Sequence, residues 1–378
     1  MPREYQVTVS PYMQWEPKLD YSKHARKIVK DILGLKKGEN VTIEAWQHQL
    51  NFANEIKFQA RLLGANVVLL TEEEKDHWRL FNENREKVMG QVGKHEWSLI
   101  ENSDAYIFFQ GPGDLEREIA TEPKRRSTST AYNYSWYQRA TKARLRGVRI
   151  GTAYATPSRA KVYGFDHVKW YKNALDALDV DYEQIEAKAK RVGKSLRGKS
   201  IEISSQNGSR LKLKMTRALP HVYSGLMKKN PAYNDFSVLM TVPGGEIDLV
   251  PVPTSVEGRV RFDCPVLRMG KKVEGLKWTF KGGKLARYSA SKNQAAFKKP
   301  YDSAKGEKDR VGVLAIGLNP KLAYGFNNDL SVEGALSIGL GSFGEGDKNK
   351  TDFAFYATLS KGTLRAGKKT IIKSGKLL

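Results

Sequence analysis

A strand–helix–strand pattern at residues 41–70 is the feature that most constrains how this chain can fold. Residues 41–45 alternate in polarity as a strand does, and residues 50–63 place Phe52, Ile56 and Leu63 at helical spacing. Residues 66–70 form a second apolar strand, so we expect two parallel strands whose sheet is covered by the helix. Residues 105–110 and 148–153 are two further strand candidates for the same sheet.

The pattern changes close to residue 195. Apolar residues alternate on both sides of Gln206-Asn207-Gly208, which is typical of a β-hairpin. Short strand candidates follow at residues 237–242, 258–262, 275–280 and 284–289. We therefore predict an α/β fold with a parallel-sheet domain at residues 1–195 and a β-rich (α+β) domain at residues 196–378. The length of 378 residues agrees with two domains of roughly 150 residues or more each.

Composition excludes several classes of protein. The longest apolar runs have the length of strands, and the N-terminus lacks an apolar signal core, so we expect neither a membrane span nor a secretion signal. Cys264 is the single cysteine, which excludes an internal disulfide and a cysteine-based metal cluster. These features favour a cytoplasmic protein.

Few side chains in the second domain can do metal or nucleophilic chemistry. His221 is the last of the six histidines, so residues 222–378 can form neither a histidine-based metal site nor a Ser-His-Asp triad. The carboxylates of Glu246, Asp248 and Glu257 could hold one hard cation through oxygen ligands. The alternative is that they are solvated loop acids paired with Lys and Arg.

A turn in the first domain is another candidate. Gly111-Pro112-Gly113-Asp114 follows the strand at residues 105–110, at the end where α/β proteins often bind ligands. An ordinary structural turn is the alternative.

The strongest compositional signal is positive charge. Lys and Arg number 64 against 41 Asp and Glu, giving a formal net charge of +23, which favours anionic partners. One acid-free run covers residues 353–378, and a basic segment with interleaved aromatic rings precedes residue 150. We predict that this segment binds RNA or a ribonucleoprotein, with cations on phosphates and with Trp136 and Tyr137 stacking on bases. Its cations are Lys124, Arg125, Arg126, Arg139, Lys142, Arg144, Arg146 and Arg149. The alternative is a solvated face over core rings.

Several segments are similar to those of one known family. They are YSKHARKIVKDILGLKKGENVTI, GANVVLL, ATPSRAKVYG, VPGGEIDLVPVPTSVEGRVRFD, VGVLAIGLNP and VEGALSIGLGSF. Through them, most of the chain resembles the thermophilic metallo-aminopeptidases of the aminopeptidase T and aminopeptidase S type. Relatives of that family include an iron-dependent dioxygenase that cleaves dihydroxypyridine. The resemblance implies an α/β domain, an aminopeptidase-T-like β-rich domain and a homodimer.

The resemblance also implies a site with two metal ions. The family holds them with two Glu, a strand His and a late His-x-Asp pair, and a Tyr assists catalysis. The first Glu matches Glu246, but the second Glu matches Val313 and the strand His matches Ser337. The Tyr falls at or beside Phe343 and Gly344, and the His-x-Asp pair falls near Ala354 and Tyr356.

Because most ligands are replaced, we predict a family member that has lost the dinuclear site and the peptidase activity. It would act without a cofactor as a basic binding protein for RNA or a ribonucleoprotein. The alternative is a divergent metal-dependent aminopeptidase, or another small-substrate hydrolase, that uses Glu246 and a single divalent metal ion. Whether the chain is an enzyme stays open at this point.

Overall fold

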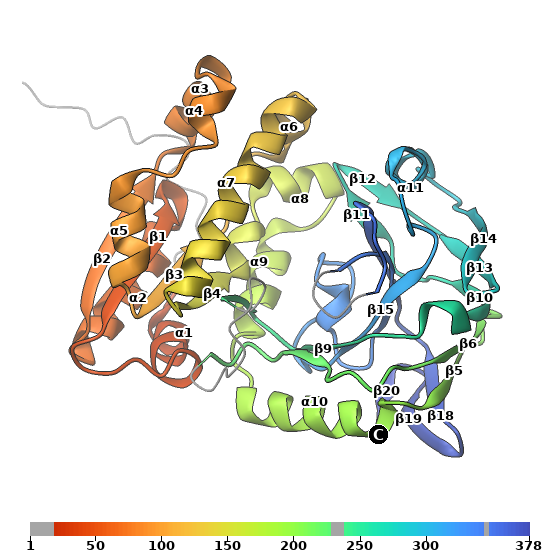
Figure 1. Ribbon diagram of the computed structural model, residues 1–378. Helices are drawn as coiled ribbons and strands as arrows, with labels where there is room; N and C mark the ends of the chain where they lie inside the picture. Colours follow the sequence, from red (N-terminus) through yellow and green to blue (C-terminus); the bar gives the residue numbers. More distant parts are fainter. Residues whose placement is uncertain (1–18, 228–237, 344–347) are drawn as a thin grey trace, which may run out of the picture. The chain divides into compact units, whose positions relative to one another are not determined.

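The computed structural model describes residues 19–227, 238–343 and 348–378 (Figure 1). The chain forms two compact units. The first contains Met1–Lys161, Asp166–Tyr171 and Met227–Val242, and the second contains Val162–Phe165, Lys172–Leu226 and Pro243–Leu378. The boundary expected near residue 195 is therefore not a single point. Lys172 and the residues that follow it already belong to the second unit, whereas Met227–Val242 returns to the first. The first unit is α/β and the second is rich in antiparallel sheet, which confirms the predicted fold class.

A five-stranded parallel sheet forms the centre of the first unit, with the order β2-β1-β3-β4-β8. The strands are β1 (Asn40–Trp46), β2 (Asn66–Glu72), β3 (Ala105–Phe109), β4 (Arg146–Ile150) and β8 (Leu239–Val242). The strand–helix–strand pattern at residues 41–70 is confirmed, with α2 (Leu50–Leu62) between β1 and β2. Ile43, Phe52 and Ile56 are fully buried, as the helical spacing requires.

β8 joins this sheet from much later in the chain. Gly147 on β4 permits the close approach, because a Cβ atom there would lie 2.2 Å from Leu239 Cδ2. The other helices of this part of the chain vary from one turn to twenty residues in length. They are α1 (Ser22–Arg26), the π-helix η2 (Lys27–Ile32), α3 (Glu74–Glu83), α4 (Glu86–Met89), α5 (Lys94–Asn102), α6 (Leu115–Ala120), α7 (Pro123–Lys142), α8 (Pro157–Tyr163) and α9 (His167–Asp176).

α10 (Tyr182–Leu196) is the first helix that lies wholly within the second unit. The Asp181 side chain caps this helix by accepting a hydrogen bond from the Gln184 amide. An antiparallel five-stranded sheet follows, in the order β17-β16-β15-β9-β7. Its strands are β7 (His221–Tyr223), β9 (Glu246–Leu249), β15 (Val311–Gly317), β16 (Leu336–Gly341) and β17 (Ala354–Leu359).

An eight-stranded antiparallel sheet completes the second unit, in the order β14-β13-β10-β6-β5-β18-β19-β20. The hairpin predicted around Gln206-Asn207-Gly208 joins β5 to β6, and Gly208 has φ +87° in the turn. Trp278, Phe280 and Phe297 fill the core beneath the sheet. The strands are β5 (Ser200–Ser204), β6 (Arg210–Lys214), β10 (Glu257–Arg261), β13 (Lys277–Lys281), β14 (Lys284–Ser289), β18 (Thr363–Ala366), β19 (Lys369–Lys373) and β20 (Lys376–Leu377).

The described part of this unit also contains a small ribbon, the helix α11 and two 3-10 helices, η5 (Pro253–Ser255) and η6 (Asp329–Ser331). The ribbon pairs β11 (Val266–Arg268) with β12 (Lys271–Val273), and α11 (Ala295–Ser303) carries Phe297. Within the described ranges, every helix is too short or too polar to cross a membrane.

Candidate functional site

Two carboxylates on β9 form the centre of the candidate site. Glu246 and Asp248 are two residues apart on the strand, so their side chains lie on the same face of it. Ser331 Oγ donates a hydrogen bond to Glu246 Oε2 at 2.6 Å, and the Tyr356 hydroxyl donates one to Asp248 Oδ2 at 3.1 Å. Three distant segments of the second unit therefore converge on these two acids.

The strand starts where it does because of a tightly packed loop. A Cβ atom on Gly244 would lie 2.6 Å from the backbone nitrogen of Gly225, and one on Gly245 would lie 2.7 Å from Asn319 Cβ. Asn319 Nδ2 donates to the Gly244 carbonyl at 2.8 Å, and Gly245 has φ +136°. These contacts set the position at which Glu246 enters the site.

Burial changes the acidity of both carboxyl groups. It raises the pKa of Glu246 to about 7, against the hydrogen bond from Ser331, which acts to lower it. Burial, and then the charge of Glu246, raises the pKa of Asp248 well above its ordinary range. Burial and the two acids also raise the pKa of Tyr356. Since two buried carboxyl groups that interact cannot both ionise easily, the pair holds a proton near neutral pH.

The positions that the resemblance assigns to metal ligands carry other side chains. Val313 on β15 is buried, and buried Ser337 on β16 has its hydroxyl 2.7 Å from Thr358 Oγ1. The rings of Phe343 and Tyr356 lie 4.2 Å apart between centroids. Ala354, at the start of β17, is exposed. Hydroxyl and apolar groups that contact one another therefore replace the expected imidazoles and carboxylates.

Packing around Gly339 shows how closely these groups fill the space. A Cβ atom on Gly339 would lie 2.4 Å from Val313 Cγ1 and 2.6 Å from the Phe343 ring. The valine and the phenylalanine thus pack over the backbone of β16, where additional side-chain atoms have no room.

The donor set does not fit a dinuclear metal site. Glu257 lies on β10 in the eight-stranded sheet, is exposed, and accepts a hydrogen bond from the Gly282 amide, so it does not join Glu246 and Asp248. Across residues 19–227, 238–343 and 348–378, no group of three or more His, Cys, Asp or Glu side chains is placed to hold a metal ion. The structure does not assemble the expected three-carboxylate group, because the strands of its members belong to different sheets.

The basic segment predicted to bind RNA forms α7 and β4, and much of its charge is used inside the protein. Arg125 Nη1 donates to the Phe81 and Asn84 carbonyls, and Arg126 Nη1 donates to the Glu118 carbonyl at 3.0 Å. Arg139 pairs with Glu101 at 2.6 Å, and Arg146 pairs with Glu39 at 2.7 Å. Lys124, Lys142 and Arg144 are exposed to solvent.

The aromatic residues of this segment lie differently from the prediction. Trp136 is 6% exposed and packs edge-on against Tyr106, in a core cluster with Val238 and Leu239. Tyr137 is half-buried, and its hydroxyl accepts a hydrogen bond from Arg149. Trp136 is a core residue because it lies on the face of α7 that packs on the sheet, so stacking on a base was the wrong role for it.

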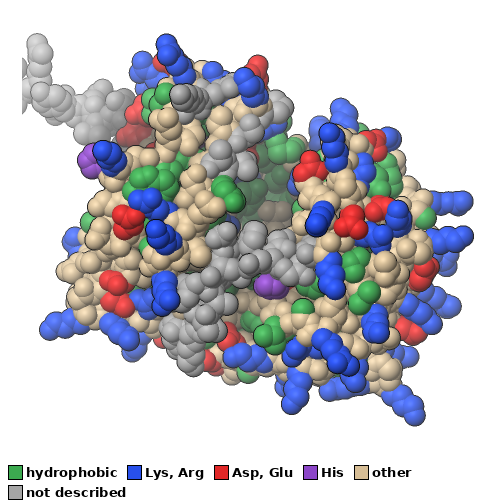
Figure 2. Space-filling view, viewed as in Figure 1, with side chains coloured by type: hydrophobic (Ala, Val, Ile, Leu, Met, Phe, Trp, Pro, Cys, Tyr) green, Lys and Arg blue, Asp and Glu red, His purple; other side chains and the backbone are tan. Residues whose placement is uncertain are grey.

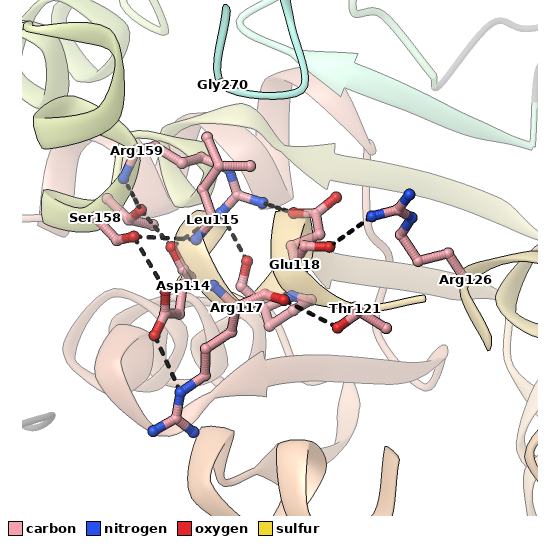
Figure 3. A network of polar contacts seen from close by, with 12 residues as sticks. Asp114, Leu115, Arg117, Glu118, Thr121, Arg126, Ser158, Arg159 and Gly270 are labelled. Carbon is pink, nitrogen blue, oxygen red and sulfur yellow. Dashed lines mark hydrogen bonds and ion pairs between the residues drawn. The ribbon is translucent and has the colours of Figure 1, made fainter. Parts of the chain in front are cut away.

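The turn at Gly111–Asp114 is a structural one, held by a polar network (Figure 3). Asp114 caps α6 by accepting from the Arg117 amide at 3.1 Å. The buried Arg159 donates to the Pro112 carbonyl at 2.6 Å and to Glu118 Oε2 at 2.9 Å. Since Arg159 Nη1 and Nη2 bond to carbonyl and carboxylate groups of the protein itself, the network stabilises the loop at the end of β3.

Sequence reasoning identified Glu246 and Asp248 but missed their partners. Ser331 lies 85 residues from Glu246, and Tyr356 lies 108 residues from Asp248. Tyr356 lies on β17, which reaches β9 only through β16 and β15, and Ser331 lies in the 3-10 helix η6, so periodicity along one strand reveals neither partner. The aligned position of Tyr356 within the expected His-x-Asp pair was the one available signal.

The chain matches one family model and is similar to two solved structures. The family model for thermophilic metalloprotease (M29) matches residues 18–324. Wild-type AmpT from Thermus thermophilus has a similar structure, with a TM-score of 0.70 and 14% identity over 95% of this chain and 98% of that one. The 2,5-dihydroxypyridine dioxygenase from Pseudomonas putida KT2440 is similar with a TM-score of 0.63 and 13% identity, covering 95% and 96%. No curated protein sequence matches.

Proposed function

Because this chain belongs to the thermophilic metalloprotease (M29) family, we propose that it is a member without the dinuclear metal centre, and that it acts as a cytoplasmic binding protein for RNA or a ribonucleoprotein. The first part of the proposal rests on the pair of acids on β9, of which Asp248 is buried and Glu246 partly buried, and whose partners are hydroxyl groups. The net charge of +23 supports the second part.

Without a bound cation, the acid pair favours its protonated form. Metal ligands must be deprotonated, and a water molecule is activated only where the ligands leave enough positive charge on the metal. Glu246 and Asp248 instead have raised pKa values, because burial favours their neutral forms. Ser331 and Tyr356 hold the two side chains in place through hydrogen bonds. The family's two-metal reaction would need further ligands, and Val313 and Ser337 occupy two of the positions that would supply them.

The second candidate function is a hydrolase that uses a single divalent cation, and the surroundings of one carboxylate oxygen support it. Asp248 Oδ1 is buried and, among the described residues, has no hydrogen-bond partner. A cation on Glu246 and Asp248 would satisfy this oxygen and would lower both pKa values. Such a protein would be a divergent aminopeptidase or another small-substrate hydrolase.

Elemental analysis and an aminopeptidase assay test the proposal. We expect the purified protein to contain far less than one equivalent of zinc, cobalt, manganese or iron, and to hydrolyse leucyl and other aminoacyl substrates no faster than Glu246→Gln. Glu257→Gln is the matched control, since this acid is exposed and lies in the other sheet. Metal-stimulated turnover in the wild type and in Glu257→Gln, lost in Glu246→Gln, would establish the hydrolase instead.

Direct RNA binding tests the second part. The exposed cations of the α7 segment, Lys124, Lys142 and Arg144, are candidate contacts. Binding that weakens as salt rises is the expected result, because each phosphate contact releases condensed cations.

A further inference from the structure

The eight-stranded sheet of the second unit presents one strongly basic face. Burial alternates along its strands, so that on β6 Leu211 and Leu213 are buried while the residues between and beside them are exposed. The strand register places the exposed residues of neighbouring strands opposite one another, so they lie on the same face of the sheet. Its exposed cations are Arg210, Lys212, Lys214, Arg259, Arg261, Lys277, Lys281, Lys284, Arg287, Arg365, Lys373 and Lys376.

Side chains of this kind can be seen on the surface of the second unit. In Figure 2, Lys and Arg side chains protrude along the right-hand margin, over the region where Figure 1 labels β14, β13, β10 and β6. The acids on the same face of these strands are Glu202 and Glu257. Both stand opposite Lys212 in the register, and Glu202 pairs with it at 2.9 Å.

Away from these two acids, like charges stand directly opposite one another. The register pairs Arg210 with Arg259, Arg261 with Lys277, Lys281 with Lys284, and Lys373 with Lys376. Like charges at opposed positions of an antiparallel pair lower the stability of a sheet. Fold stability explains only part of this face, through the ion pair of Lys284 with Asp309 at 3.7 Å and the hydrogen bond from Arg259 Nε to the Gly208 carbonyl at 3.1 Å, whereas attraction of an anionic partner explains the rest.

The chemistry of the face also limits which part of an anion it can contact. The aromatic residues of β13, Trp278 and Phe280, point into the core. The uncharged positions on the outer face are small, and include Ser200, Ser204 and Thr279. Such a surface offers donors and positive charge for phosphates, but on these strands it offers no ring that could stack on a base.

We propose that this face, which we call the basic sheet face, binds the phosphodiester backbone of RNA without reading its bases. The proposal rests on the RNA-binding function proposed above and relocates its main contact from the α7 segment to the second unit. A second copy of the chain is a poor occupant, because a two-fold contact would place this positive surface against itself.

A three-residue variant tests the surface. Arg210→Thr, Arg259→Thr and Arg287→Thr remove a row of cations that the register connects through Thr279, and threonine keeps the strand propensity. The probe is a labelled single-stranded RNA of mixed sequence and about 30 nucleotides, longer than a typical single binding site. Binding is measured over a range of KCl concentrations.

The expected loss follows from counterion release. Each phosphate contact on a single strand contributes about 0.7 to the slope of log affinity against log salt. Losing three contacts should lower the slope by about two and weaken binding by about 100-fold near 0.1 M salt, from the same relation. The melting temperature of this variant should stay within about 3 °C of that of the wild type, because an opposed pair of like charges is removed together with the hydrogen bond from Arg259 Nε to the Gly208 carbonyl.

Two further variants separate the outcomes. A charge-matched control, Arg79→Gln with Lys169→Gln and Lys172→Gln, removes three exposed cations from α3 and α9 and should bind RNA as the wild type does. A segment variant, Lys124→Ala with Lys142→Ala and Arg144→Asn, tests the rival location. If it loses affinity while the sheet variant does not, RNA binding stands and the basic sheet face is overturned.

Three other outcomes would contradict the basic sheet face or the RNA-binding function itself. If the sheet variant and the charge-matched control weaken binding equally, net charge alone explains binding and the basic sheet face fails. If the wild type does not bind the RNA near 50 mM salt, the proposed RNA-binding function fails too. Phosphatidylserine vesicles that bind the wild type but not the sheet variant, in the absence of RNA binding, would assign the face to a membrane surface.

Discussion

Glu246 is the residue whose ionisation is most closely connected to the candidate site. In the folded protein, burial raises its pKa from 4.5 to about 7, so it keeps its proton over a pH range in which the unfolded chain has lost it. The folded state therefore binds more protons between these two values, and the free energy of unfolding falls as pH rises through them. Above pH 7 Glu246 is ionised in the folded protein as well, so the folded state bears the full free-energy cost of burying this charge.

Glu246→Gln should remove this pH dependence. The glutamine side chain cannot ionise, and its oxygen can still accept the hydrogen bond from Ser331. We expect no advantage over the wild type near pH 4, and a gain that approaches about 3 kcal/mol above pH 7, because each pKa unit corresponds to about 1.4 kcal/mol. Thermal melts across this range measure it, with Glu257→Gln as an exposed control. Parallel profiles for Glu246→Gln and the wild type would contradict the buried-acid description.

At the scale of secondary structure, the edge strand β8 depends on one glycine. Gly147→Ala would place a Cβ atom 2.2 Å from Leu239 Cδ2 and 2.8 Å from the Val238 carbonyl oxygen. Overpacking of this kind typically costs about 1–3 kcal/mol, so the melting temperature of the first unit should fall. A chemical or thermal melt monitored by tryptophan fluorescence measures the change, since Trp136 lies in the same cluster.

Two matched variants make this effect specific. Gly93→Ala should change little, because nothing lies within 4 Å of the added Cβ atom. Leu239→Ala combined with Gly147→Ala should be less destabilising than the two separate costs added together, because the clash involves the leucine side chain. Strict additivity would show that the close approach of β4 and β8 is not the cause.

Sequence periodicity predicted the local elements, including the strand that forms β8, but assigned that strand to the second domain because its partner is distant in the sequence. The helix α2 and the strands β1 and β2 carry their whole pattern within thirty residues or so. By contrast, β8 belongs to the first sheet through its pairing with β4, and the expected strand at residues 148–153 ends at Ile150, where Gly151 begins a 3-10 turn. Trp136 was misassigned because a helix with cations on several faces hides which face is buried.

Charge acts at the scale of the whole molecule. A net charge of +23 repels itself in the compact state, and salt screens that repulsion, with a Debye length of about 10 Å at 0.1 M. We expect the melting temperature to rise as KCl is increased from about 20 mM to about 300 mM, by roughly 2–5 °C. Differential scanning calorimetry measures this shift. A melting temperature that falls steadily with KCl would mean that attractive ion pairs, rather than repulsion, dominate.

The return of β8 to the first unit constrains how the protein can fold during its synthesis. Val238 and Leu239 complete the cluster that contains Tyr106 and Trp136, yet the ribosome adds them about a hundred residues after Trp136. At a typical elongation rate of about 5–20 residues per second, the apolar surface around this tryptophan waits several seconds or more for its last partners. A nascent chain shorter than about 240 residues is thus a natural client for a chaperone, and a fragment ending at residue 195 lacks a strand of its own sheet.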